Sequence, residues 1–158
     1  MFDLVNGLPL HPLVVHAIVV LLPLATLGTV AIALRPRWRR PYGPLVVGSA
    51  LAAAILCPVA TESGEQLERH VGDPGAHAEL GDTLVWFAIA LVLASAALVW
   101  LDRRAGATPG EGGSTRVVTA VAVVAVLVGL ASGVQVYRVG DSGARAAWGD
   151  AVTESATP

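Results

Sequence analysis

The sequence LPLHPLVVHAIVVLLPLATLGTVAIAL, residues 8–34, contains no Asp, Glu, Lys or Arg. A helix needs about 20 apolar residues to cross a bilayer, so this stretch is long enough to span a membrane. It nevertheless carries His11 and His16 near its beginning. An ionisable side chain inside a membrane span is costly and usually marks a functional site. The stretch therefore predicts a membrane helix with a polar site near one end.

The composition of the whole chain agrees with a membrane protein. Hydrophobic residues make up 54% of the 158 residues, charged residues make up only 14%, and the mean hydropathy is +0.67. These values are too apolar for an ordinary soluble domain of this length. All ten basic residues are arginine and the net charge is −2, so no basic stripe indicates nucleic acid as a partner. The single cysteine, Cys57, excludes an intrachain disulfide.

The predicted fold is all-α, a polytopic four-helix membrane bundle in a single domain covering residues 1–158. Four apolar spans of bilayer-crossing length are expected at about 9–34, 42–61, 77–101 and 116–138, each bounded by turn or charged residues. The segments between and after them are expected to be arginine-rich loops at 35–41 and 102–116, a short helix at about 64–71 and a tail at 139–158. Ser63 begins a capping-box pattern, which predicts that this short helix starts there.

Arginine predicts the orientation, because short loops rich in Arg or Lys stay in the cytoplasm. Seven arginines lie in or beside the first and third loops: Arg35, Arg37, Arg39, Arg40, Arg103, Arg104 and Arg116. The opposite side has only Arg69, Arg138 and Arg145. Both termini are therefore expected on the extracytoplasmic side. All four histidines, which are His11, His16, His70 and His77, then lie at or near the outer face.

Two of these histidines are expected at similar depth. Pro12 suits the first turn of a helix, which places His16 about one turn inside the first span. Asp73 followed by proline is typical of a cap and a first turn, which places His77 about one turn inside the third span. His11 lies five residues before His16, hence roughly 140° around the helix from it, so the two are not expected to bind one ion together. We interpret His11 as an interfacial residue.

Two histidines at matched depth on parallel helices favour a cofactor site. The leading hypothesis is a redox module that holds haem b between His16 and His77, with Arg138 or Arg145 pairing with the propionates. The alternative is a transition-metal site built from His16, His77 and Glu62. A third possibility is a non-catalytic membrane subunit or scaffold in which the histidines only satisfy helix packing. No nucleophile with an adjacent base indicates an enzyme, and that question stays open.

The expected partners are the lipid bilayer and either a membrane redox protein or a second copy of the chain. Small residues in Gly129-Leu-Ala-Ser-Gly133 allow helices to approach closely, either within the bundle, which we favour, or across a homodimer. No internal repeat is evident in the sequence.

Several motifs together resemble a known family. They are Leu8-Pro-Leu-His-Pro-Leu-Val-Val-His16, Ser63-Gly-Glu-Gln-Leu-Glu68, His77-Ala-Glu-Leu-Gly81 and Gly140-Asp-Ser-Gly-Ala144. The set resembles the bacterial membrane proteins of the domain-of-unknown-function 2231 family, especially actinobacterial members, over nearly the whole chain. Many relatives continue the opening motif with an aromatic residue and a proline, where this chain has Ala17 and Ile18. The resemblance implies a small four-helix, multi-pass protein of the bacterial cytoplasmic membrane and brings no established activity.

Overall fold

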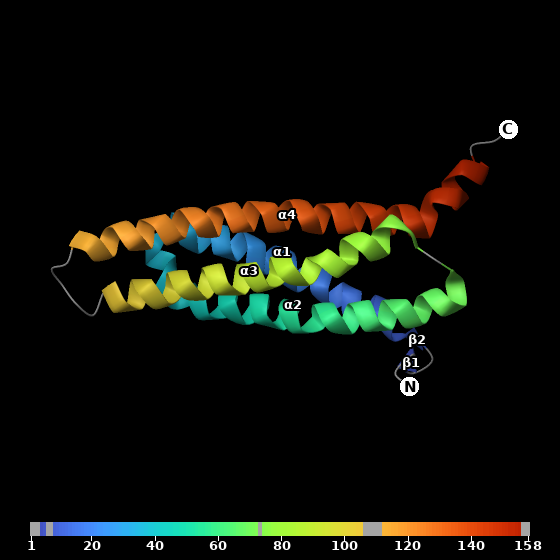
Figure 1. Ribbon diagram of the computed structural model, residues 1–158, viewed down its shortest axis with the longest axis horizontal. Coiled ribbons are helices and arrows are strands. Elements are labelled where there is room, and N and C mark those ends of the chain that lie inside the picture. Colours follow the sequence, from blue (N-terminus) through green and yellow to red (C-terminus); the bar gives the residue numbers. More distant parts are fainter. Residues whose placement is uncertain (1–3, 6–7, 73, 106–111, 156–158) are drawn as a thin grey trace.

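The computed structural model describes residues 4–5, 8–72, 74–105 and 112–155. Two short strands, β1 (Leu4–Val5) and β2 (Leu8–Pro9), pair antiparallel ahead of four long helices. These are α1 (Leu10–Leu34), α2 (Pro36–Val71), α3 (Ala76–Ala105) and α4 (Gly112–Ser155). Each contains a stretch long and apolar enough to cross a membrane. The helices pack along one another as the predicted four-helix bundle (Figure 1).

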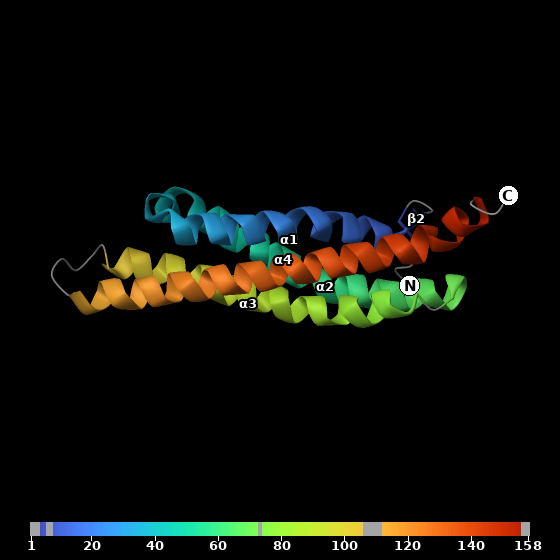
Figure 2. The same ribbon diagram turned by 90° about the horizontal axis from the view of Figure 1, so that it is seen from above.

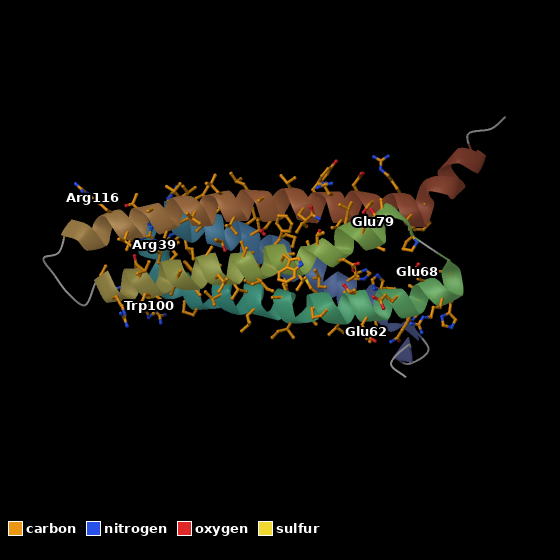
Figure 3. All side chains as sticks on the ribbon, viewed as in Figure 1. Arg39, Glu62, Glu68, Glu79, Trp100 and Arg116 are labelled. Atoms are coloured by element: carbon orange, nitrogen blue, oxygen red, sulfur yellow. The ribbon has the colours of Figure 1, made fainter. Side chains whose placement is uncertain are left out.

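The helices form a ring in the order α1, α2, α3, α4, with α4 closing on α1 and with α1 touching α3 along a diagonal. Seen from above, α1 and α3 lie on either side of α4 (Figure 2). We call the end where α1 and α3 begin the histidine end and the opposite end the arginine end. Arg39, Trp100 and Arg116 lie toward the arginine end, whereas the labelled glutamates lie toward the histidine end (Figure 3). The first and last described residues are both at the histidine end (Figure 1).

The outer surface of the bundle carries many large apolar side chains. The inner faces are filled by residues such as Leu22, Ala25 and Leu91, none of which is exposed. On the outside, however, large aliphatic side chains are exposed by 60% or more: Val20, Leu27, Leu45, Leu93 and Leu127. Such a surface suits hydrocarbon rather than water, and the helices satisfy their own backbone hydrogen bonds. The chain is therefore a multi-pass membrane protein in contact with the lipid bilayer.

The second helix is longer than the sequence pattern predicts. The short helix expected at 64–71 is the end of α2, which runs unbroken from Pro36 to Val71. Ser63 does not cap a new helix, because its hydroxyl donates to the Val59 backbone oxygen, at 2.7 Å, one turn back in the same helix. The helix ends before Gly72, whose φ of +95° lies in the region that favours glycine.

The expected loops and tail also become largely helical. The segment 35–41 supplies the first turn of α2, where Pro36 occupies a position that tolerates the missing N–H. Both ends of the loop expected at 102–116 are helical, because α3 continues to Ala105 and α4 begins at Gly112. The expected tail at 139–158 continues α4 as far as Ser155. Asp73, the expected cap of the third helix, lies outside the described residues.

Glycines bring three pairs of helices into close contact. A Cβ atom on Gly28 of α1 would lie 2.7 Å from Val46 of α2, and one on Gly43 of α2 would lie 2.6 Å from Val99 of α3. Gly129 of α4 has the same relation to Val30 of α1, also at 2.7 Å. Real Cβ atoms do not approach so closely, so these positions need glycine in order for the helices to pack. The Gly129 motif therefore serves a contact within the bundle.

Candidate functional site

The four histidines of the histidine end share one hydrogen-bonding pattern. His11 Nδ1 donates to the Ala60 backbone oxygen at 2.8 Å, across the contact of α1 with α2. His16 and His70 donate from Nδ1 to the backbone oxygen four residues earlier in their own helices, at 2.5 and 3.0 Å. Because each acceptor is a carbonyl, Nδ1 must carry the proton. In the neutral imidazole, Nε2 then keeps its lone pair.

His77 follows the same rule through a hydroxyl. Its Nδ1 lies 3.3 Å from Ser142 Oγ on α4, and that hydroxyl donates its only proton to the Val139 backbone oxygen at 2.9 Å. Ser142 therefore accepts from His77 Nδ1. The imidazole also lies directly over Gly143, where a Cβ atom would come within 2.9 Å of the ring. The imidazole of His77 can therefore pack in this place because Gly143 has no side chain.

His11 and His16 point to different surroundings, as their spacing predicts. The imidazole of His11 is half-buried and lies over Gly64 of α2, at 3.1 Å from where a Cβ atom would be. His16 is exposed, and its Nδ1 bonds to the Pro12 backbone oxygen of its own helix. His11, interpreted above as an interfacial residue, is therefore the histidine that joins two helices, whereas His16 lies on the outer surface of α1.

The other predicted ligands have separate environments. Glu62 is exposed on α2. Arg138 donates to Gln135 Oε1 at 3.4 Å, and Arg145 pairs with Asp141 at 3.0 Å. Across the described ranges, no group of three or more His, Cys, Asp or Glu side chains is placed to hold a metal ion. His16 bonds to the Pro12 backbone oxygen in α1 and His77 bonds to Ser142 of α4, and a haem or metal ion between the two histidines stays a prediction.

A polar network between α3 and α4 was not anticipated from the sequence. Gln135 is only 4% exposed, and its amide nitrogen donates to Thr83 Oγ1 at 2.7 Å and to the Leu80 backbone oxygen at 3.1 Å. A buried amide needs such partners, because an unpaired polar group inside a bilayer costs several kcal/mol. The signal was present in the sequence, since Gln135 is an isolated amide within an otherwise apolar span.

At the arginine end, one arginine is buried rather than solvated. Arg39 is 6% exposed, and it donates to the backbone oxygens of Ile32 and Ala33, each at 3.0 Å, near the end of α1. Its remaining nitrogen, Nη1, forms an ion pair with Asp102 of α3 at 3.0 Å. Arg39 therefore ties three helices together. Composition alone does not distinguish it from the exposed Arg37 and Arg40 beside it.

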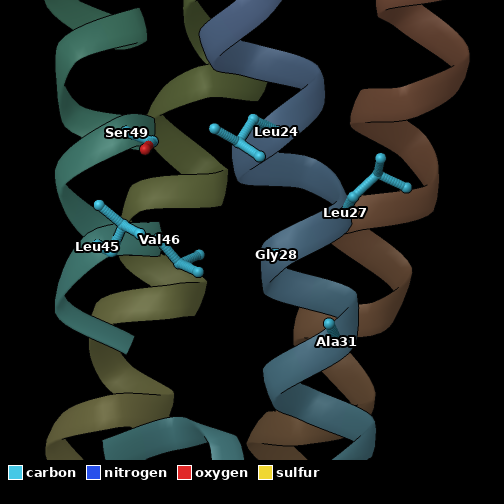
Figure 4. Close-up of a pocket in the computed structure, with 7 residues that line it drawn as sticks. All are labelled: Leu24, Leu27, Gly28, Ala31, Leu45, Val46 and Ser49. Carbon is cyan, nitrogen blue, oxygen red and sulfur yellow. The ribbon is translucent and has the colours of Figure 1, made fainter. Parts of the chain in front are cut away.

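Two surface grooves accompany the helix contacts. One, of about 240 Å³, lies between α1 and α2 and is lined by Leu24, Leu27, Gly28, Ala31, Leu45, Val46 and Ser49 (Figure 4). The other, of about 420 Å³, lies between α1 and α4 beside Gly129 and Gly133. Both are almost wholly apolar, without the few converging polar groups that mark a specific ligand site. None of the four histidines lines either groove.

Comparison with known proteins supports the family resemblance seen in the sequence. No curated protein matches the chain, and no solved structure matches it either. A family model described as "Predicted membrane protein (DUF2231)" matches residues 7–156, which include all four helices in full. The chain therefore belongs to the DUF2231 family of predicted membrane proteins.

Proposed function

We propose that this protein is a non-catalytic membrane subunit or scaffold whose polar groups hold the bundle together. One observation carries the proposal: His11 and His77 each lie over a glycine of the neighbouring helix and donate a hydrogen bond to that helix. Their rings are used in helix packing. Arg39 and Gln135 serve the same purpose elsewhere in the bundle.

Single histidine variants test this proposal in full-length protein purified in mild detergent. His11→Ala and His77→Ala each remove a hydrogen bond between helices and the packing over a glycine, so we expect a lower unfolding midpoint for both. His16→Ala and His70→Ala are the matched controls, since each side chain is exposed and bonds within its own helix. If the controls lose as much stability as His11→Ala and His77→Ala, the proposal is wrong.

A second candidate is the haem b redox module or the transition-metal protein suggested by the sequence. The observation that favours it is the common tautomer: at His16 and His77 it is Nδ1 that donates a hydrogen bond, so Nε2 keeps its lone pair in the neutral imidazole. This is the state that metal-ligating histidines usually have. Haem would supply one-electron chemistry, with Arg138 or Arg145 near the propionates, and a metal ion would add Glu62 as a third ligand.

The His16→Ala variant distinguishes the two candidates. The scaffold proposal predicts that the purified protein holds no stoichiometric haem or metal ion. It also predicts that His16→Ala leaves the visible spectrum, the metal content and the unfolding midpoint unchanged. The cofactor proposal predicts a reduced α-band after haem reconstitution, or about one metal ion per chain by elemental analysis, and loss of either signal in His16→Ala and His77→Ala. A cofactor signal that depends on both histidines would overturn the scaffold proposal.

We also propose that the protein resides in the bacterial cytoplasmic membrane with its histidine end outside. The separation of charge supports this orientation, because Arg35, Arg37, Arg40, Arg103 and Arg104 all belong to the arginine end. In that orientation, partners of a subunit or scaffold would meet His16 and His70 from the extracytoplasmic side.

A further inference from the structure

The contact of α1 with α2 and the contact of α3 with α4 repeat one arrangement at the histidine end. His11, the second residue of α1, lies over Gly64 of α2. His77, the second residue of α3, lies over Gly143 of α4. In each case the histidine begins a hairpin of two helices, and the glycine lies in the second helix of that same hairpin.

The residues before the two glycines are also alike. Each glycine follows an acidic residue and a serine, in the order Glu62-Ser63-Gly64 and Asp141-Ser142-Gly143. Both serine hydroxyls donate back along their own helix: Ser63 to the Val59 backbone oxygen, four residues earlier, at 2.7 Å, and Ser142 to the Val139 backbone oxygen, three residues earlier, at 2.9 Å. The acid-serine-glycine motif therefore receives a histidine in both hairpins, although the motif is too short to be noticed as a repeat in the sequence.

Burial along the first helix of each hairpin gives an independent comparison. Aligning His11 with His77 without a gap fixes the register of α1 against α3. In that register, every buried residue of α3 falls on a buried residue of α1. The pairs are Ile18 with Leu84, Leu22 with Ala88, Ala25 with Leu91, Thr29 with Ser95, Ile32 with Leu98, and Ala33 with Val99. Because the histidines alone set the register, this agreement was not built into the alignment.

The second helices of the two hairpins agree in part. Aligning Gly64 with Gly143 places three of the seven buried residues of α2, which are Gly43, Cys57 and Ser63, on half-buried residues of α4. The other four fall on buried residues of α4. The pairs are Arg39 with Val118, Val46 with Ala125, Ala50 with Gly129, and Ala53 with Ser132. The two hairpins thus turn the same face toward the centre of the bundle.

Side-chain sizes are complementary where the two hairpins meet. Leu22 of α1 is equivalent to Ala88 of α3, and Ala25 of α1 is equivalent to Leu91 of α3, so at these two positions a large residue has a small counterpart. All four are fully buried and belong to one core cluster, and α1 touches α3 along the diagonal. Large against small across facing positions is how closely packed layers fill space. Two copies of one face that meet about a two-fold axis would need this pattern.

We propose that the chain consists of two copies of one helical hairpin, α1–α2 and α3–α4, related by a two-fold pseudo-axis along the bundle. The inner face of each hairpin is then an interaction surface whose partner is a second copy of that hairpin. Both copies start at the histidine end, which makes this a parallel repeat with its axis along the membrane normal. His11 and His77 become equivalent residues, and the contact of α2 with α3 corresponds to that of α4 with α1.

The pseudo-symmetry also identifies where the halves differ. Val118 stands in α4 where α2 has Arg39, so the ion pair with Asp102 joins α2 to α3 and has no equivalent between α4 and α1. The groove of about 420 Å³ lies along that second contact. The contact of α4 with α1 is therefore the weaker of two equivalent surfaces.

Exchange of side chains between equivalent positions tests the axis in the full-length protein. Leu22→Ala and Ala88→Leu are prepared singly and together, and the unfolding midpoint is measured in detergent. We expect each single variant to lower the midpoint, the first by leaving a cavity and the second by overpacking. The double variant should recover at least half of the summed loss, since a large and a small residue have only changed places across the axis.

A matched pair away from the axis provides the control. Leu22→Ala combined with Ala125→Leu uses an equally buried alanine in the other core cluster, and its two losses should simply add. If Ala88→Leu does not fold, the second equivalent pair, Leu91→Ala with Ala25→Leu, gives the same test. The proposal is overturned if the exchanged pairs recover no more stability than the control.

Discussion

At the scale of single residues, Arg39 makes more side-chain hydrogen bonds than His16, His77 or Glu62, the residues predicted from the sequence to bind a cofactor. Its guanidinium donates hydrogen bonds to two backbone carbonyls of α1 and to the carboxylate of Asp102. Arginine suits this position because its fixed fork of donors can serve several acceptors at once, whereas lysine offers a single point charge. These bonds hold the ends of α1, α2 and α3 against one another. Removal of either partner of the ion pair would leave the other charge buried without a counter-charge.

We therefore expect Arg39→Ala to be among the most destabilising single substitutions at the arginine end. The loss should be about 3–5 kcal/mol in the free energy of unfolding, the range found when one partner of a buried ion pair is removed. Unfolding by SDS titration in mixed micelles measures it. Arg40→Ala, an exposed neighbour, is the control and should change the free energy by less than about 0.5 kcal/mol. Equal effects of the two variants would contradict the assigned role.

Gly43 offers a second residue-scale prediction. Gly43→Ala would place a methyl group 2.6 Å from Val99, so α2 and α3 must separate and the protein should lose about 1–3 kcal/mol. Gly48→Ala on the same helix is the control, because nothing lies within 4 Å of its Cβ position. There the change should be neutral or stabilising by up to about 1 kcal/mol. The Gly43→Ala loss should shrink when Val99→Ala is added, which thermal unfolding of the double variant can check.

At the scale of elements, the existence of four helices could be predicted from the sequence, but several of their ends could not. Long apolar runs predict a membrane helix, because lipid offers no hydrogen-bond partners. A single segment can pair its own backbone N–H and C=O groups there only by forming a helix. Beyond the apolar runs, the same local residues can either end a helix or continue it. Ser63 and the residues after it match a capping box, yet the same hydroxyl can bond back within a continuing helix, and the tertiary contact of Gly64 with His11 favours the second outcome.

The candidate site shows the same limit at closer range. Spacing correctly separates His11 from His16 around the helix, but spacing does not say which of the two faces the neighbouring helix. That choice depends on where α2 lies, and so on the glycine that makes room at Gly64. Likewise, depth arguments place His77 near the end of the third helix but do not reveal that Ser142, from a distant part of the chain, is its partner.

Cysteine labelling tests the continuous α2. In a Cys57→Ala background, single cysteines at Glu62, Glu65 and Arg69 should react with a water-soluble maleimide, because these positions are exposed. A cysteine at Ser63 should react much more slowly, since the side chain there is only 7% exposed. A helical period that continues through Ser63 supports one helix, whereas a phase break at that residue would support the separate short helix expected from the capping box.

At the scale of the whole molecule, the four long helices that the structure describes run alternately up and down the bundle, so α1 begins at the same end at which α4 finishes. The first described residues and the end of α4 both lie at the histidine end, whereas the turn between α1 and α2 and the end of α3 lie toward the arginine end (Figure 1). Because positive charge favours the retention of short loops in the cytoplasm, the orientation proposed above depends on a few arginines at the arginine end. The four spans then act as one unit, since inverting one pair would place Arg39 and Asp102 on opposite sides.

This orientation predicts the outcome of reporter fusions in a bacterial host. Alkaline phosphatase, which is active only outside the cytoplasm, should be active when fused after residue 155 and inactive when inserted at residues 106–111; a cytoplasmic fluorescent reporter should give the opposite result. Reducing the arginine bias by replacing Arg35, Arg37 and Arg40 with Asn should produce a mixed population, because these exposed arginines contribute to orientation but not to the buried ion pair. Activity of the phosphatase at 106–111 with the native arginines would mean that the bundle is inserted the other way round, and the histidine end would then meet cytoplasmic partners.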